Sequence, residues 1–581
     1  MNRHILQDVF INFEINNPNK FTNQKNNAIV IKFSRKNKHF YSNKYIPWNG
    51  VIRSIEKGVL PCGLKCLKIH GCNEIFEIEK QVLPEGLRKL EINGRNKIHE
   101  IKKGVLPQGL KNLKILGSNR ISKLERGVLP WGLKSLEIAG YNKIREINTN
   151  VLPDGLENLK IHGYNEISEI KRGILPEGLE SLEITGFNKI REINENVLPR
   201  GLKNLKIHGF NKISKIEKGD LPEGLETLSV DTFSKILKIK SLPESLKSLV
   251  INIGIRDIKS GILPTGLKSL KIIGRITSTN NKIQKIEKGI LPEGLETLWI
   301  TGENKISKLE NLALPKSLKD LYIHGYNTIS EIKKGDLPEG LESLKLRGRS
   351  TISEIEKGVL PEGLKTFKIV ESGKISEIKK LSLPEGLKTL KISNGNNSIS
   401  EIKKGDLPES LESLSISGEY NRISKLEKGV LPESLRVLKI KWRNKISEIE
   451  KGVLPEGLKT LVIGKYNEIS KIKKGVLPGG LEYLAIYDCN TISKIEEGVL
   501  PESLKTLHID GHNTISKIEN IPVGLKNLRI CGHNKIQKIE KGDLPESLDD
   551  LTLLDNCDLS GVENIPKGLK SCYIEDEPPS P

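Results

Sequence analysis

The chain has 581 residues, and 93 Lys and Arg against 73 Asp and Glu give it a formal net charge of +20. Its hydrophobic fraction of 36% includes only 10 Phe, 4 Trp and 1 Met, so the apolar residues are mostly Ile and Leu. No stretch approaches the roughly 18 consecutive apolar residues of a membrane-spanning helix. The first residues lack the apolar core of a secretory signal, and the 7 Cys are too few for a disulfide scaffold. We therefore expect an intracellular protein that is neither secreted nor membrane-bound.

Residues 1–50 differ in composition from the rest of the chain. They hold eight basic and two acidic residues, which gives this segment a charge of 8 − 2 = +6. The apolar run from Ala28 to Phe33 predicts a strand. Since the open core at the end of a repeat stack has to be covered, we predict that residues 1–50 form a cap. A basic docking arm or localisation segment is the alternative.

Residues 51–574 consist of about 23 copies of one repeat. Among the 28 prolines, 23 form a regular series of Leu-Pro or Ile-Pro dipeptides from Pro61 to Pro566, and most steps between them are 23 residues. With this Pro as position 1, position 3 is Gly or Ser and position 4 is Leu in all 23 copies. Position 9 is usually Ile, position 11 Gly and position 13 Asn, and Ile returns near positions 15 and 18.

This pattern predicts one short strand in each copy. In L-x-x-L-x-I, positions 7 and 9 share one face of an extended segment while positions 6, 8 and 10 share the other. The Gly at position 11 suits a turn with positive φ, and the Asn at position 13 can hydrogen-bond to turn backbone, so that stacked copies form an Asn ladder. One copy cannot bury its Leu and Ile alone, whereas stacked copies can. We therefore predict a mainly β fold, a parallel β-solenoid of about 23 turns.

The repeat resembles two known families. L-x-x-L-x-I followed by Asn is similar to the leucine-rich repeat, and Gly186-Phe187-Asn188-Lys189-Ile190, followed by Gly-x-Leu-Pro-x-Gly-Leu-x-x-Leu in other copies, resembles the FNIP repeat more closely. This resemblance extends over about residues 50–575 and points to proteins of amoebae and of giant viruses that infect them. It implies a repeat scaffold without catalytic residues. Some relatives carry an N-terminal F-box that couples to a ubiquitin ligase, but residues 1–50 lack its Leu-Pro opening, and only Ile5–Phe10 faintly resembles part of it.

Position 8 alternates in charge through the first half of the array. It reads Lys68, Glu91, Lys114, Glu137, Lys160, Glu183 and Lys206. Because position 8 of adjacent turns would be direct neighbours, the alternation predicts a ladder of opposite charges, which stabilises the stack by only about 0–1 kcal/mol per exposed pair.

The alternation ends after Pro222, and a candidate interaction surface follows. We predict partner binding by an aromatic group and a basic stripe at positions 8 and 10: Trp299, Tyr322, His324, Lys345, Arg347, Lys368 and Lys391. Aromatic and Arg side chains dominate the energetics of protein interfaces. The competing interpretation is drift among exposed, near-neutral positions. The insertion Gly274–Lys282 lies just before this surface in the sequence.

Three further groups of side chains invite a functional reading. Position 12 holds Tyr141, Tyr164, Phe187, Phe210 and Phe233, for which we predict a structural ladder of stacked rings. Cys66 and His70 lie four residues apart on one strand, about 13 Å, which is too far for them and the nearby Cys62 and Cys72 to share one zinc ion. A weaker metal or thiol candidate near the other end comprises Cys489, His508, Asp510, His512, Cys531 and His533. We predict no catalytic residue, no cofactor and no metal.

The sequence thus favours a non-enzymatic scaffold, because no catalytic motif stands apart from the repeat. We expect a monomer that binds an as yet unidentified protein, with a host protein as one candidate. A substrate adaptor of a ubiquitin ligase is one alternative. A nucleic-acid-binding protein is the other, disfavoured because half of the strand face is charge-balanced. Residues 575–581, an acidic, Pro-rich tail, are expected to be disordered.

Overall fold

The computed structural model describes residues 28–32, 54–55, 57–58, 60–70, 75–231, 238–251, 260–274, 283–371, 373–393, 395–464, 466–487, 490–532, 534, 536, 539–554, 565–566 and 568–575. The described residues divide into two compact units, with the boundary between Ile273 and Gly274. Both are parallel β-solenoids with one short strand per turn, as the sequence predicts. No helix among these ranges is long and apolar enough to cross a membrane.

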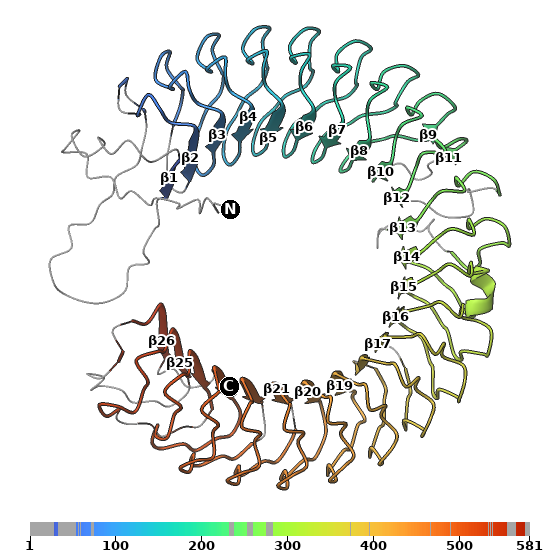
Figure 1. Ribbon diagram of the computed structural model, residues 1–581, viewed down its shortest axis with the longest axis vertical. Coiled ribbons are helices and arrows are strands. Elements are labelled where there is room, and N and C mark those ends of the chain that lie inside the picture. Colours follow the sequence, from blue (N-terminus) through green and yellow to red (C-terminus); the bar gives the residue numbers. More distant parts are fainter. Residues whose placement is uncertain are drawn as a thin grey trace, which may run out of the picture. The chain divides into compact units, whose positions relative to one another are not determined.

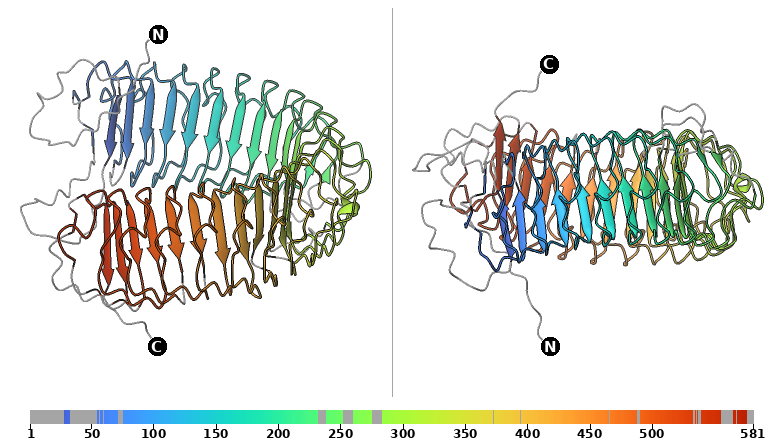
Figure 2. Two further views of the ribbon diagram at one scale, coloured as in Figure 1. Left: turned by 60° about the horizontal axis from the view of Figure 1, so that its bottom comes forward. Right: turned by 90° about the horizontal axis from the view of Figure 1, so that it is seen from above.

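Unit 1, residues 1–273, stacks its strands in chain order, each parallel to the next (Figures 1 and 2). The main strands are β1 (Ala28–Lys32), β2 (Cys66–His70), β3 (Lys89–Ile92), β4 (Asn112–Ile115), β5 (Ser135–Ile138), β6 (Asn158–Ile161), β7 (Ser181–Ile184), β8 (Asn204–Ile207), β10 (Thr227–Val230), β12 (Ser248–Ile251) and β13 (Ser269–Ile273). A two-residue pair, β9 (Lys215–Ile216) and β11 (Lys238–Ile239), joins two return segments. The strand predicted from Ala28 onward is present as β1 and pairs with β2; Phe33 and most of residues 1–50 lie outside the described ranges.

Unit 2, residues 274–581, repeats the same arrangement. Its strands are β14 (Thr297–Thr301), β15 (Asp320–Gly325), β16 (Ser343–Gly348), β17 (Thr366–Val370), β18 (Thr389–Ser393), β19 (Ser413–Ser417), β20 (Val437–Lys441), β21 (Thr460–Ile463), β22 (Tyr483–Ile486), β23 (Thr506–Ile509), β24 (Asn527–Ile530), β25 (Asp550–Leu554) and β26 (Ser571–Glu575). A single 3₁₀ turn, η3 (Leu309–Leu312), is the only helical segment among its described residues.

The repeat positions map onto the fold as a buried frame. In the copy that starts at Pro199, Leu202, Leu205, Ile207 and Ile213 are all buried, with at most 1% of each side chain exposed. The Pro opens a turn in which the Leu202 N–H donates to the Pro199 carbonyl over 3.1 Å. The chain then enters the strand, whose burial alternates along positions 6 to 9. The same turn recurs at other Leu-Pro sites, which explains why positions 1 and 4 vary so little.

The Asn at position 13 forms the predicted ladder. Asn188 is fully buried; its side-chain oxygen accepts from the Ile167 N–H of the preceding turn over 3.1 Å, and its amide donates to the Thr185 carbonyl over 2.9 Å. Equivalent bonds to the preceding turn run from Asn96 to Asn211 in unit 1 and recur from Asn327 onward in unit 2. Each buried amide therefore joins two turns and satisfies backbone groups that would otherwise lose water without replacement.

The Gly at position 11 is required by close packing as well as by its backbone angle. Gly186 has φ +100°, and a Cβ there would lie 2.0 Å from the Gly163 carbonyl oxygen of the preceding turn. The Phe187 N–H donates to that same oxygen over 2.9 Å. A side chain at this position would therefore break the turn-to-turn contact, since real Cβ atoms do not approach an oxygen so closely.

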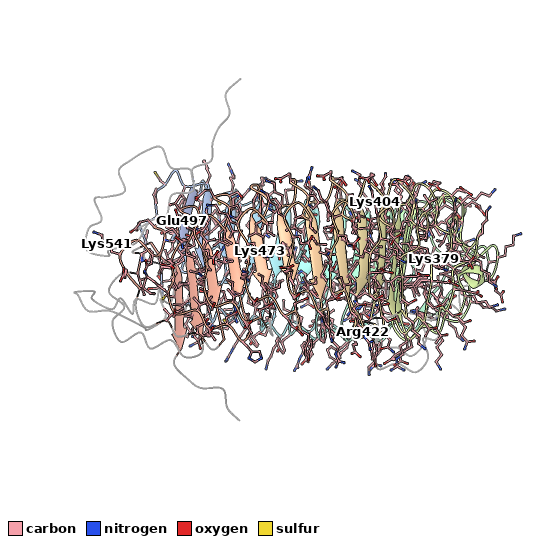
Figure 3. The ribbon with its side chains drawn as sticks, turned by 90° about the horizontal axis from the view of Figure 1, so that it is seen from below. Lys379, Lys404, Arg422, Lys473, Glu497 and Lys541 are labelled. Atoms are coloured by element: carbon pink, nitrogen blue, oxygen red, sulfur yellow. The ribbon has the colours of Figure 1, made fainter. Side chains whose placement is uncertain are left out.

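The return segments are polar on their outer side. In unit 2, Figure 3 labels Lys379 and Lys473 among charged side chains that come from the segments between strands. Lys379 pairs with Glu354 at 2.6 Å and Lys473 with Glu448 at 2.8 Å, each one turn back. Such exposed pairs contribute little stability individually, but they place opposite charges side by side in adjacent turns.

Candidate interaction surface

The strands β14 to β18 bring the sequence-predicted surface residues into two adjacent rows. Parallel, in-register pairing places Trp299, Tyr322, Lys345, Lys368 and Lys391 in one row. His324 and Arg347 are partners in the neighbouring row, two residues further along each strand. All seven side chains are half-buried on the strand face, which lies opposite to the return segments. We call these seven residues the strand-face patch.

Trp299 and Tyr322 form an aromatic pair at one end of the patch. Their rings meet edge to face, with centroids 5.7 Å apart and planes at 82°. The Trp299 indole N–H donates to Asp320 Oδ2 over 2.7 Å, and Lys345 Nζ donates to Asp320 Oδ1 over 3.1 Å. Asp320 therefore fixes the Trp299 ring and neutralises the first lysine of the row. An aromatic pair held in place in this way loses little conformational entropy when a partner binds.

His324 extends the aromatic end of the patch. Its ring lies beside Tyr322, with centroids 6.1 Å apart and an interplanar angle of 19°. Burial lowers the pKa of His324, and the neighbouring Arg347 guanidinium lowers it further. The imidazole is therefore neutral at physiological pH and acts as part of an uncharged, amphipathic surface rather than as a cation.

Arg347 is held by an acidic neighbour. Its Nε and Nη2 donate to the two carboxylate oxygens of Glu371 over 2.9 and 2.6 Å, a two-point contact across one turn. The predicted basic stripe is therefore balanced at its first two cations, since Lys345 bonds to Asp320 and Arg347 to Glu371. The sequence interpretation identified the cations but missed both acids, which lie at positions 6 and 11 rather than at positions 8 and 10.

In unit 1 the same strand position carries the predicted ladder of opposite charges. Lys114 lies 2.8 Å from Glu137, and Glu183 lies 3.4 Å from Lys160 and 2.5 Å from Lys206. Glu183 is the most enclosed of these side chains, at 15% exposed. The ladder stabilises the stacking of turns with opposite charges at position 8. It leaves little net charge on this face to attract a ligand.

The aromatic residues at position 12 stack as predicted. Tyr141, Tyr164, Phe187 and Phe210 follow one another with centroid distances of 4.9, 4.7 and 4.8 Å and interplanar angles of 11 to 15°. Phe233 lies outside the described residues. Because each inner ring has both faces covered by its neighbours, bases or other flat ligands cannot stack on them, which supports a structural role.

The cysteine and histidine groups yield no assembled site within the described ranges, where no three potential metal ligands gather. Cys72, Cys489, His533 and insertion residues 275–282 lie outside these ranges. Cys62 is an exposed free thiol, and Cys531 is only 2% exposed.

A polar aromatic cluster near the end of unit 2 was not predicted as such. The hydroxyl groups of Tyr483 and Tyr487 each lie 3.4 Å from His508 Nδ1, and the Tyr483 and His508 rings meet edge to face at 5.6 Å. Burial raises the pKa of Tyr487, with a smaller contribution from Tyr483. Tyr483 and Tyr487 lie two residues before and after Ala485, which is fully buried. Reading positions 6, 8 and 10 together, rather than position 8 alone, would have identified this cluster.

Comparisons with known proteins agree with this architecture. Seven stretches match the FNIP repeat: residues 73–119, 96–139, 119–164, 210–252, 326–371, 397–442 and 444–489. CroV588, a giant-virus protein described as a novel circular LRR protein, is similar in structure with a TM-score of 0.58 and 26% identity, over 89% of this chain and 79% of CroV588. TLR13, solved in a complex with ssRNA13, has a TM-score of 0.60 and 19% identity over 90% of this chain and 84% of its own, which shows the fold alone. No curated protein matches the sequence.

Proposed function

We propose that this chain, which belongs to the FNIP-repeat family and folds as a leucine-rich-repeat-like solenoid, is a non-enzymatic scaffold that binds a protein through the strand-face patch. One observation carries the proposal. The Trp299–Tyr322 pair stands at the start of a row that continues with Lys345, Lys368 and Lys391, and Asp320 holds the Trp299 ring in a defined orientation. Large aromatic side chains, half-buried and fixed in place, are the usual energetic centre of a protein interface.

Other features support this proposal over the alternatives. Arg347 and Lys345 are occupied by carboxylates, which weakens a phosphate-binding reading of the same stripe. The ubiquitin-ligase adaptor would depend on residues 1–50, of which only β1 is described, and it stays a prediction. The exposed, free thiols of Cys62 and Cys572 support our proposal of an intracellular location.

Affinity capture from the native cell tests the proposed surface. We expect Trp299→Ala with Tyr322→Ala to lose a protein that the wild-type chain retains. Trp131→Ala is the matched control, because Trp131 is 78% exposed and lies outside the strands. A partner kept by the double variant, or lost equally with Trp131→Ala, would overturn the assignment. A partner lost only on removal of residues 1–50 would favour the adaptor.

A further inference from the structure

Four lysines continue the strand-face row of unit 2 beyond the aromatic pair. Lys368 and Lys391 are direct neighbours on β17 and β18. Ser415 on β19 follows, and then Lys439 on β20, with Lys441 two residues further on the same face. Neighbouring strands lie about 4.8 Å apart, so Lys391 and Lys439 flank the short Ser415 side chain at about 10 Å from backbone to backbone. We call Lys368, Lys391, Lys439 and Lys441 the lysine cluster.

The lysine cluster has no counter-ion among the described residues, where none of its members forms an ion pair. Two acids in the same turns are engaged elsewhere: Glu371 with Arg347, and Glu412 with Lys388 at 2.8 Å. Burial lowers the pKa of Lys368, and the adjacent Lys345 and Lys391 ammonium groups lower it further. Burial also lowers the pKa of Lys441, and the ammonium groups of Lys439 and Lys391 lower it further. Lys368 and Lys441 are therefore each close enough to Lys391 to be repelled by its ammonium group.

This arrangement departs from the rest of the array. On β4 to β8 the corresponding lysines alternate with glutamates and pair with them. Like charges directly opposite one another in a sheet are destabilising, so the folded chain gains nothing from the lysine cluster by itself. Beside it, on the same strand as Lys391, the hydroxyl of Ser393 is buried and has no hydrogen-bond partner in the described structure. An unpaired, half-enclosed group of cations is complementary to an anionic ligand.

We propose that the lysine cluster binds a carboxylate-rich segment of a protein partner. This inference deepens the proposed function, on which it rests, by specifying the chemistry of the partner. From Trp299 on β14 to Lys439 on β20 there are six strand-to-strand steps, about 29 Å. An extended peptide of about nine residues spans that distance, with an apolar side chain at the Trp299–Tyr322 end and acidic side chains at the lysine end.

The extent of the cluster favours a peptide over a nucleic acid. The next turns in the row carry Val462 and Ala485, and the other end of the row is occupied by Trp299, Tyr322 and the carboxylate of Asp320. A phosphate backbone would need a longer, continuous basic track. A short cluster with an aromatic pair beyond it suits a peptide that combines acidic and apolar side chains.

Fluorescence anisotropy on the full chain tests the inference, with labelled deca-glutamate and oligouridylate of equal length as probes. At about 50 mM salt we expect deca-glutamate to bind, and to weaken markedly at about 200 mM. Lys391→Gln with Lys439→Gln should weaken it by about tenfold. Lys114→Gln with Lys160→Gln removes the same charge from the paired ladder of unit 1 and should change the affinity by less than about twofold.

Three outcomes would overturn the inference: no binding of deca-glutamate at low salt, an equal loss in both double variants, or tighter binding of oligouridylate that depends on Lys391 and Lys439. The last outcome would assign the cluster to nucleic acid. Circular dichroism melting checks that both double variants are folded. Failure here is distinguishable from failure of the proposed function, because Trp299→Ala with Tyr322→Ala leaves the lysine cluster intact and is read by capture of the native partner.

Discussion

The strand faces of the two units share their buried rows and differ in their exposed ones. On β4 to β8 of unit 1, position 8 alternates Lys and Glu, and the charges pair between turns. On β14 to β20 of unit 2, the same position carries Trp, Tyr, Lys, Lys, Lys, Ser and Lys. Beneath both, Leu and Ile at positions 7 and 9 are buried to the same degree. Since the frame does not depend on the exposed rows, those rows are where binding can differ between regions.

Substitution of the glycines at position 11 gives the largest expected effect. It tests whether the two units have the same buried frame. A Cβ at Gly186 in unit 1 would lie 2.0 Å from the Gly163 carbonyl oxygen, and one at Gly348 in unit 2 would lie 1.8 Å from that of Gly325. We expect either Gly→Ala change to cost more than about 3 kcal/mol, from the steric clash and the positive φ. Urea unfolding, or loss of soluble folded protein, measures this.

The control for the substitutions at position 11 is Gly173→Ala. Gly173 also has positive φ, at +78°, but its Cβ would meet no atom within 4 Å. Only the backbone penalty of about 1 kcal/mol then applies. Equal losses at Gly186 and Gly173 would show that the close contact between turns does not matter.

The Asn ladder should give the next largest effect, again in both units. Asn188→Ala leaves the Ile167 N–H and the Thr185 carbonyl without their partners, and Asn490→Ala does the same to Ile469 and Tyr487. Because these groups are buried, we expect each change to lower the free energy of unfolding by about 2–4 kcal/mol. Asn194→Ala, at an exposed site, should change it by less than about 0.5 kcal/mol. A cost in one unit alone would contradict a common frame.

Reversing a charge at position 8 should change the stability in opposite directions in the two units. Glu183→Lys in unit 1 places a third lysine between Lys160 and Lys206 and should destabilise the fold by about 1 kcal/mol. Lys368→Glu in unit 2 places a carboxylate between Lys345 and Lys391 and should stabilise the fold by up to about 1 kcal/mol while weakening deca-glutamate binding. The urea midpoints of the two variants should shift in opposite directions. Shifts of the same sign would contradict the claim that the charges of this row are paired in unit 1 and unpaired in unit 2.

The smallest expected effect is a pH dependence shared by both units. Burial lowers the pKa of His162, His324 and His508 below the ordinary 6.5. The unfolded chain then takes up these protons first, so their contribution to stability is fully present above pH 6.5 and is lost as the pH falls from that value through the lower pKa of each folded-state histidine. Urea midpoints should therefore decline modestly from about pH 7.5 to about pH 5.5. In a variant with all three changed to Gln the decline should be smaller, and an unchanged decline would assign it to other groups.

The sequence predicted the frame well because each frame position has one physical task that repeats in every copy. The Leu-Pro turn, the buried Leu and Ile, the Gly and the Asn all follow from spacing alone, and the structure confirms them. The first and last segments of the chain, predicted as a cap and a tail, lie largely outside the described residues and stay predictions.

The candidate surface was predicted less completely, because its chemistry depends on which side chains meet across turns. Row order identified Trp299, Tyr322 and the lysines. It did not identify Asp320, which bonds to both Trp299 and Lys345, because the acid belongs to position 6 and its contacts depend on rotamers. Glu371 was missed for the same reason: it meets Arg347 from position 11 of the next turn.

The Asn ladder also bears on how such a chain can change in length. Where a turn has 24 residues, the Ile375 N–H still reaches Asn397 and the Ile399 N–H still reaches Asn421, so one extra residue between strand and Asn is absorbed locally. Every partner of a ladder Asn lies in its own turn or in the adjacent one. When the gene gains or loses a whole copy, each ladder bond can therefore form again between the new neighbouring turns. The array can change in length by one turn at a time without losing the ladder.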